Sequence, residues 1–305
     1  MENNILDSFT KGLIKERLNV YGIVVRQHGD IIAKKQYRED NFVQLYSGSK
    51  TVTAMGIMFA LNEGLLKLDD KVVSFFPNEE LPDDPNGYLK KMNVEHLLTM
   101  TTGHETSSLD VFYYNKCDNF INLFFNAPIK YEPGTKFEYD NGATYMLSCI
   151  IQKLTGQKLR DYLMPRLFDK LDIFNPQWDS SAWDVTLGYI GLHLTTEQYS
   201  RLGQLLLNGG EWYGNQVIPY QYVDMMVKKH VDNPGYWNDI EMGSGYGYQL
   251  WMCSVPGAYR LDGLYGQFCI VFPDKDAVIC VTSHQEGNQN DILRLIYNTV
   301  LKELD

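Results

Sequence analysis

The chain has 305 residues, of which 44% are hydrophobic and 21% charged, enough for one large domain or two closely packed lobes. Its 27 Lys and Arg residues against 38 Asp and Glu residues give a formal net charge of −11. Because affinity for nucleic acid comes from basic patches, this balance excludes nucleic acid as the main partner. No apolar run approaches the roughly 20 residues of a membrane span, and the first residues lack the apolar core of a signal peptide. We therefore expect a cytoplasmic protein with no membrane partner.

The first segment predicts a helix over residues 6–18 and then a β-hairpin. Residues 21–26 and 31–33 are rich in β-branched side chains and flank a tight turn at His28-Gly29-Asp30.

A Ser-x-x-Lys pattern follows, formed by Ser47 and Lys50 at the start of an apolar run that ends near Gly64. A helix that is apolar nearly all round is buried, so both side chains lie on one face at its N-terminus. Amide N–H groups and the helix dipole stabilise an alkoxide or oxyanion there. The same field and desolvation lower the pKa of a lysine, so Lys50 is a candidate base and Ser47 a candidate nucleophile.

The pattern alone is weak, because Ser8 and Lys11 also fit it. Those two residues lie in the amphipathic helix at the start of the chain, where we expect a solvated lysine. The position of Ser47 before a wholly apolar helix favours catalysis.

A serine–lysine pair also needs a group that protonates the leaving atom, and a tyrosine can do this if positive charge lowers its pKa. The motif Tyr-x-Asn occurs four times, beginning at Tyr113, Tyr139, Tyr213 and Tyr236. Tyr139 follows the turn at Pro133-Gly134 and precedes a periodic helix over residues 143–154 that stops at Gly156. This context favours Tyr139 and Asn141, on a loop at a helix start facing a cleft. Tyr213 is expected in a surface turn, and Tyr113 and Tyr236 in pocket-lining stretches.

The rest of the chain predicts one more helix and a second hairpin. Thr195 and Gln198 form a capping box before a helix over residues 199–207. A strand is expected at 246–253, a hairpin from 267–272 and 277–282, and a helix at 290–302. The prediction is an α+β fold whose antiparallel sheet is built from both chain ends, flanked by helices, with a mostly helical lobe inserted. We expect residues 1–72 and 245–305 in one lobe, 73–244 in the other, and the active site between them.

The cysteines and histidines predict no cofactor or metal site. The five cysteines are scattered and predict buried or half-buried thiols, and the six histidines never occur at metal-ligand spacing. His104 is expected in a turn. Trp178, Trp183 and Trp237 are candidates for the pocket wall, although such tryptophans are more often core residues.

With these residues assembled, the chain resembles the serine β-lactamase and penicillin-binding-protein superfamily, in its class C β-lactamase-like branch of esterases, D-amino-acid peptidases and amide hydrolases. Ser47-Gly48-Ser49-Lys50 matches the first motif, and Tyr139-Asp140-Asn141 the second. The resemblance implies a β-lactamase/transpeptidase-like fold. It makes Ser47 the acylated nucleophile, Lys50 its base and Tyr139 the end of the proton relay. Asn141 would bind the substrate's acyl side chain or hold Lys50.

The third motif departs from the family's Lys-Thr-Gly. The corresponding stretch is Leu261-Asp262-Gly263, so the family's cationic lysine is replaced by leucine. Gly263 is kept, as close backbone approach requires. The resemblance makes Leu264 N–H an oxyanion donor together with Ser47 N–H. Asp262 either repels substrate carboxylates or is a solvated charge on an edge strand. Arg260 is expected to point to the opposite face of the strand from Leu261.

Two classes of function follow. The favoured one is a cofactor-free serine hydrolase that cleaves a small-molecule ester, amide or peptide, including β-lactams or D-amino-acid peptides, through a Ser47 acyl-enzyme. The alternative is a penicillin-binding-like sensing or binding protein with slow or no turnover.

Overall fold

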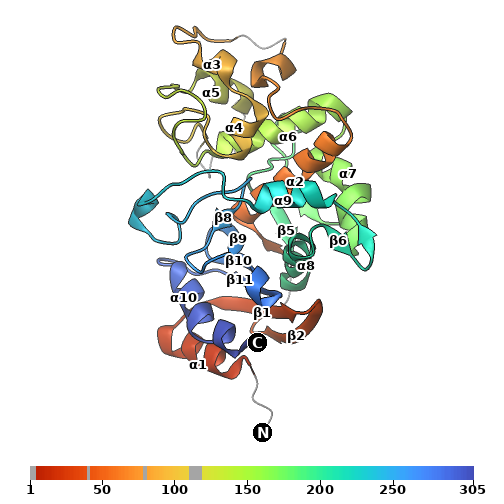
Figure 1. The fold of residues 1–305 in the computed structure, drawn as a ribbon, viewed down its shortest axis with the longest axis vertical. Coiled ribbons are helices and arrows are strands. Elements are labelled where there is room, and N and C mark those ends of the chain that lie inside the picture. Colours follow the sequence, from red (N-terminus) through yellow and green to blue (C-terminus); the bar gives the residue numbers. More distant parts are fainter. Residues whose placement is uncertain (1–4, 40–41, 78–80, 110–118) are drawn as a thin grey trace.

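The computed structural model describes residues 5–39, 42–77, 81–109 and 119–305. Its centre is a six-stranded antiparallel sheet of order β2-β1-β11-β10-β9-β8. Figure 1 shows the two ends of the chain together at this sheet. The strands are β1 (Val20–Gln27), β2 (Asp30–Gln36), β8 (Trp251–Met252), β9 (Tyr259–Gly263), β10 (Gln267–Phe272) and β11 (Ala277–Ser283). The expected sheet from both chain ends is confirmed, because β1 pairs with β11 from Val20 opposite Ser283 to Gln27 opposite Ala277.

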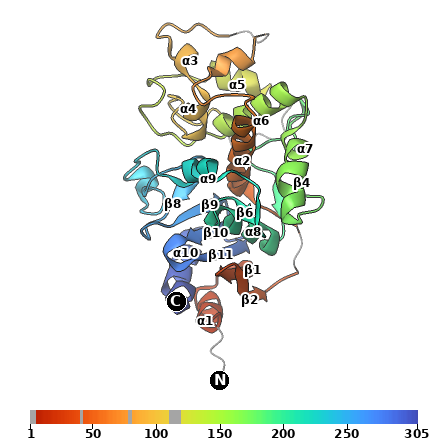
Figure 2. The ribbon, with the colours of Figure 1, turned by 45° about the vertical axis from the view of Figure 1, so that its right-hand side comes forward.

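The central strands are buried on both faces, and their side chains alternate between two hydrophobic clusters. Ile23 and Val25 face one cluster with the terminal helices α1 (Asp7–Glu16) and α10 (Asn290–Asn298). Val24 faces the other, to which α8 (Thr196–Leu207) contributes. This alternation is the period of two that a strand imposes. The sheet is therefore covered by helices on both sides (Figure 2).

Helix α2 (Ser49–Asn62) runs from the sheet into a group of further helices, some alongside it and some beyond it (Figures 1 and 2). They are α3 (Tyr88–Lys91), α4 (Val94–Leu98), α5 (Phe120–Asn126), α6 (Asn141–Thr155), α7 (Leu159–Leu163) and α9 (Tyr220–Val227). The short strands are β3 (Val43–Gln44), β4 (Gln177–Trp178), β5 (Leu192–Leu194), β6 (Glu211–Trp212) and β7 (Asn215–Gln216). Among the described residues, no helix has the length and apolar character needed to cross a membrane.

Several local signals of the sequence are found in the structure. Thr195 caps α8 with a capping box formed with Gln198, and Gly156 ends α6 in the left-handed conformation at φ 69°. Helix α8 comes from the segment assigned to the inserted lobe, yet it packs against β11, β10 and β1. The boundary at residue 245 stays a prediction.

The expected strand over residues 246–253 is wrong for most of its length, because only Trp251–Met252 form a strand. Gln249 has a left-handed backbone, with φ 59°, and extended pairing cannot pass through such a residue. Its buried side chain instead donates to Leu97 O (2.9 Å) and accepts from Thr144 Oγ1 (2.6 Å). Gln249 therefore ties the end of the sheet to α4 and α6.

Candidate active site

Ser47 lies in a 3₁₀ turn, Tyr46–Gly48, that leads directly into α2. Residues 49–60 of this helix are all buried, as the all-round apolar pattern predicts. Ser47 itself is half-buried and lines a cavity, whereas Lys50 is 1% exposed. In the terminal helix, Ser8 and Lys11 of the second Ser-x-x-Lys pattern are both exposed, so that match carries no site.

Within the described part of the chain, the Lys50 side-chain nitrogen has three polar neighbours. Its Nζ is 2.9 Å from Ser47 Oγ, 2.8 Å from Asn141 Oδ1 and 3.2 Å from Tyr189 O. Two of these, the amide oxygen and the carbonyl, can only accept a hydrogen bond. In the neutral amine, the two N–H bonds point to these acceptors and the lone pair is left for the Ser47 hydroxyl.

Burial shifts the protonation of Lys50 toward that neutral form. Desolvation lowers the pKa of Lys50 to about 7, against the smaller opposing effect of the Asp140 carboxylate. A cation without full solvation is disfavoured, so the amine is available near neutral pH. This is the direction expected from the sequence.

Tyr139 lies beside the same pair, just before α6, and its ring is 4.8 Å from Lys50 Nζ. Burial raises the pKa of Tyr139 well above its usual value, although a hydrogen bond with Ser47 lowers it. The condition set out from the sequence for this role, a tyrosine pKa lowered by positive charge, is therefore not met. Tyr139 stays a protonated phenol near neutral pH, which suits a proton donor.

Asp140, the residue between Tyr139 and Asn141, fixes the start of α6. Its Oδ1 accepts from Gly142 N (2.8 Å) as the helix N-cap and from Ser108 N (2.8 Å), and its Oδ2 lies 3.0 Å from His104 Nδ1. Burial alone raises the pKa of Asp140, but bonds from His104 and Ser108 and the charge of His104 hold it below its usual range. An Asp directly before a helix can be predicted as an N-cap from the sequence. Its contact with His104, 36 residues away, leaves no pattern in the sequence that would predict it. His104 is fully buried in this contact.

Strand β9 forms the opposite side of the site. Leu261 is fully buried in the core, and Arg260 points to the other face, as expected, where its Nε donates to Asp262 Oδ2 at 2.8 Å. The interpretation of Asp262 as a solvated edge-strand charge is wrong, because β8 is the edge and Asp262 is 7% exposed. At Gly263, a Cβ atom would lie 2.0 Å from Leu45 O, so only glycine fits beside the turn that carries Ser47.

These elements enclose a cavity of about 400 Å³. It brings together Ser47, Tyr139, Asn141 and Leu264, four of the six residues singled out from the sequence. Lys50 lies behind Ser47, and Gly263 precedes Leu264. The cavity is also lined by residues that sequence reasoning missed as site residues, namely Ser107, Leu109, Met242, Trp251 and Gln289.

The other candidates lie elsewhere. Trp237 lines the cavity, but Trp178 is buried and Trp183 is 58% exposed beside a different hollow. Tyr236 Oη accepts a hydrogen bond from Tyr139 N (3.1 Å), so this second Tyr-x-Asn match supports the first. Tyr213 is 82% exposed, and Tyr113 lies outside the described residues.

The cavity thus brings a buried lysine into contact with a serine at the head of an apolar helix, with a tyrosine beside both. The family model described as Beta-lactamase matches residues 10–301, and the chain belongs to this family. It has the β-lactamase/transpeptidase-like fold.

Among curated proteins, the chain is 24% identical over 168 residues to a lovastatin esterase of Penicillium rubens, covering 48% of this chain and 41% of that protein. It is 25% identical over 182 residues to esterase EstB of Burkholderia gladioli, covering 50% and 46%. The chain thus spans less than half the length of these two relatives. Among solved structures, EstCE1, a hydrolase with promiscuous acyltransferase activity, shares the fold with a TM-score of 0.77 and 15% identity, covering 96% of this chain and 97% of that one.

Proposed function

We propose that the protein is a serine hydrolase that cleaves an ester or amide through an acyl-enzyme on Ser47. The observation that carries this proposal is the contact of Ser47 Oγ with a buried Lys50 whose pKa is about 7. A hydroxyl beside a neutral amine is an activated nucleophile that needs no histidine. The esterase relatives support the reaction class.

The first half-reaction uses groups of four residues. Lys50 Nζ accepts the Ser47 proton while Oγ attacks the substrate carbonyl carbon. The oxygen of the resulting tetrahedral intermediate carries the negative charge, and Ser47 N–H and Leu264 N–H are the donors that stabilise it in this proposal. Tyr139 donates its phenolic proton to the departing oxygen or nitrogen and regains a proton that originates on Lys50. The leaving group departs and Ser47 remains acylated.

The second half-reaction reverses these roles. Water enters the cavity and gives its proton to the Lys50–Tyr139 pair as its oxygen attacks the acyl carbon. Collapse of the second intermediate returns a proton to Ser47 Oγ and releases the acid. Asn141 Oδ1 orients the lysine throughout, and every proton is returned to its starting group.

The test is time-resolved intact mass of the protein mixed with p-nitrophenyl butyrate, run beside Ser47→Ala. Wild type should gain one butyryl group transiently while nitrophenol release continues, and Ser47→Ala should gain none. Equal turnover by the variant would remove Ser47 as the nucleophile. An adduct that forms and never decays would favour the sensing or binding alternative.

A further inference from the structure

The cavity beside Ser47 is mostly apolar and aromatic, with one charged side chain among its described lining residues. That side chain is Asp262, with 5% of its side-chain surface exposed. A carboxylate buried beside apolar walls is costly unless it is paired, so its position at this cavity needs an explanation.

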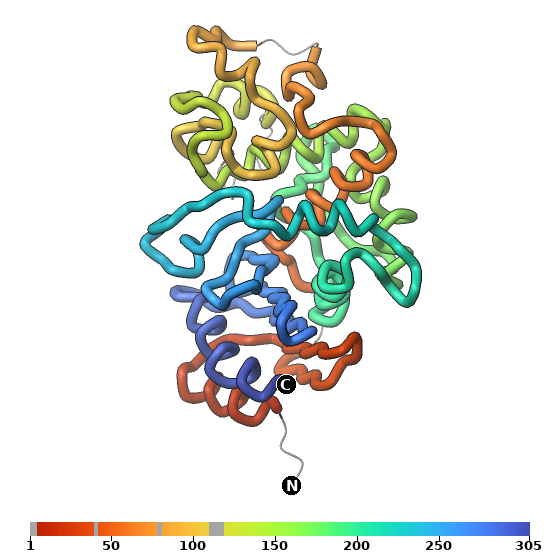
Figure 3. Tube along the Cα trace, viewed as in Figure 1, coloured from red at the N-terminus to blue at the C-terminus, as the bar shows by residue number. Residues whose placement is uncertain are grey.

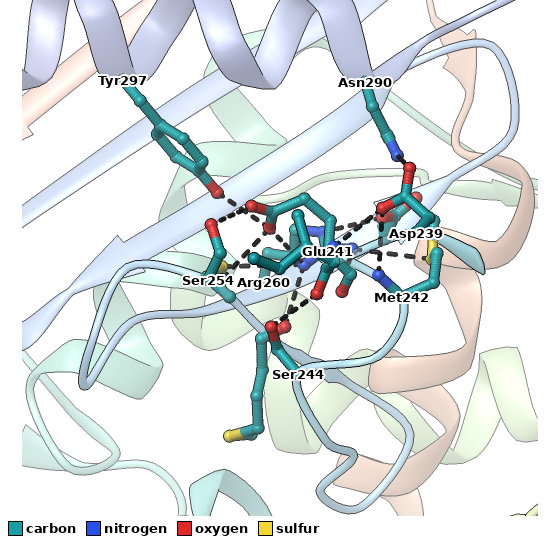
Figure 4. A network of polar contacts seen from close by, with 12 residues as sticks. Asp239, Glu241, Met242, Ser244, Ser254, Arg260, Asn290 and Tyr297 are labelled. Carbon is teal, nitrogen blue, oxygen red and sulfur yellow. Dashed lines mark hydrogen bonds and ion pairs between the residues drawn. The ribbon is translucent and has the colours of Figure 1, made fainter. Parts of the chain in front are cut away.

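Its pairing partner is Arg260, which is shared with other acids. Figure 4 shows this network. Arg260 donates to Asp262 Oδ2 (2.8 Å) and to Glu241 Oε2 (3.3 Å), while nearby Asp239 is bonded by Asn290 Nδ2 at 2.9 Å. Among the described residues of this group, three carboxyl side chains lie around one guanidinium, which bonds two of them directly.

Asp262 retains the capacity to bind a further donor. Its Oδ2 is engaged by Arg260, but its Oδ1 receives only a long contact, 3.5 Å from Gln289 Nε2, among the described residues. Glu241, in contrast, also accepts from Ser254 and from the Tyr297 hydroxyl. The unfilled carboxylate oxygen thus belongs to the residue that lines the cavity.

Aromatic rings line the same cavity. The ring centres of Trp237 and Trp251 are 6.3 Å apart, and Tyr139 lies 5.3 Å from Trp251 and 5.9 Å from Trp237. Aromatic faces attract cations, most strongly where water is partly excluded. The long loop between α9 and β8, which extends to one side in Figure 3, carries Trp237 and Met242 to this wall.

We propose that this cavity selects ester or amide substrates that carry an alkylammonium group, with Asp262 as the specificity-determining residue and Trp237 and Trp251 as the walls of the cation site. The inference rests on the proposed function. An anionic substituent would face the Asp262 carboxylate, and a neutral one would bring no positive charge to it.

The test compares substrates of equal shape and different charge. The acyl series is p-nitrophenyl 4-(trimethylammonio)butanoate, its neutral carbon isostere p-nitrophenyl 5,5-dimethylhexanoate, and the anionic p-nitrophenyl hemiglutarate. The leaving-group pair is acetylthiocholine and 3,3-dimethylbutyl thioacetate. In at least one series, kcat/KM for the cationic substrate should be about tenfold higher than for its neutral isostere, mainly because KM is lower. The anionic substrate should have the lowest kcat/KM of its series. A ratio near one in both series would overturn the inference.

Two variants and one control test whether Asp262 causes the preference for cationic substrates. Asp262→Asn should bring the cation-to-isostere ratio close to one, while Asp276→Asn, the same charge change on the exposed turn before β11, should leave it unchanged. Because Asp262→Asn frees the buried Arg260, it risks misfolding. Gln289→Glu leaves that ion pair intact and should raise the ratio; an unchanged ratio in Gln289→Glu would count against the cation site.

A binding measurement separates this inference from the proposed function. Choline and 3,3-dimethylbutanol are titrated calorimetrically into Ser47→Ala, and choline should bind about tenfold more tightly. If neutral esters are hydrolysed through Ser47 but choline shows no advantage, only the cation site is wrong. If choline is preferred but no ester acylates the wild type, only the hydrolase proposal is wrong.

Discussion

At the scale of single residues, the protonation of Lys50 controls the proposed chemistry. Its pKa of about 7 means that activity depends on pH in the physiological range. We expect kcat/KM to rise about tenfold per pH unit below 7 and to level off above it, because only the neutral amine accepts the Ser47 proton. The measurement is a pH–rate profile with p-nitrophenyl butyrate from pH 5 to 8.5.

Asp140→Asn provides the matched variant for this profile. The Asp140 carboxylate raises the pKa of Lys50, so its removal should move the rising limb to lower pH. Asparagine is as good an N-cap as aspartate, so the start of α6 is kept. A shift to higher pH would contradict the assignment of that limb to Lys50.

The same lysine makes folding stability depend on pH. The pKa of Lys50 is lower in the folded state, so between about pH 7 and 10.5 the unfolded chain binds more protons. Raising the pH through this window therefore stabilises the folded wild type. Relative to Lys50→Met, the wild type should gain about 1.4 kcal/mol per pH unit. Urea unfolding of both proteins at pH 7 and 9 measures this gain, and parallel pH dependences would contradict it.

Tyr139 is tested against a tyrosine in the same motif that lies far from the site. Tyr139→Phe removes the phenolic proton donor and should lower kcat about 100-fold or more. Tyr213→Phe, on a side chain that is 82% exposed, should change kcat less than twofold. If Tyr139→Phe also changed kcat less than twofold, Tyr139 would have no part in proton transfer.

At the scale of elements, the site depends on how closely β9 approaches the turn before α2. A Cβ on Gly263 would overlap Leu45 O, so Gly263→Ala must push the strand away from Ser47. We expect at least a tenfold loss of kcat, because Leu264 N–H moves with the strand. The loss should persist at temperatures where the variant is fully folded by circular dichroism.

Gly29→Ala is the control for this substitution. Gly29 has φ 85°, and its added Cβ would have open space around it, in the β1–β2 turn. This variant should lose about 1 kcal/mol of stability through backbone strain and keep its kcat. If Gly263→Ala behaved in the same way, the contact with Leu45 would be of no catalytic importance.

At the scale of the whole molecule, the features predicted correctly were those that neighbouring residues determine. The capping box at Thr195, the glycine stop at Gly156 and the apolar run of α2 are all local. The pairing of both chain ends followed from two hairpins that each needed a partner.

The features that were missed depend on contacts between distant segments. Residues 246–253 have strand composition, but Gln249 is turned to bond α4 and α6. Of the two alternatives for Asp262, the solvated charge fails because Asp262 is buried beside Arg260, which also bonds Glu241 on a separate segment that no spacing connects to it. Met242, Trp251 and Gln289 reach the cavity from three separate segments, and no spacing rule connects them.

The pairing of β1 with β11 has a consequence for synthesis of the protein on the ribosome. Strand β1 has apolar side chains on both faces, and its partner β11 begins only at Ala277, about 250 residues later in the chain. At roughly 5–20 residues per second, translation leaves β1 without this neighbour for on the order of 10–50 s. Helix α8, which covers one face of β1, emerges about 70 residues before β11. The nascent chain therefore has to keep one edge of its future sheet from aggregating until β11 has been synthesised.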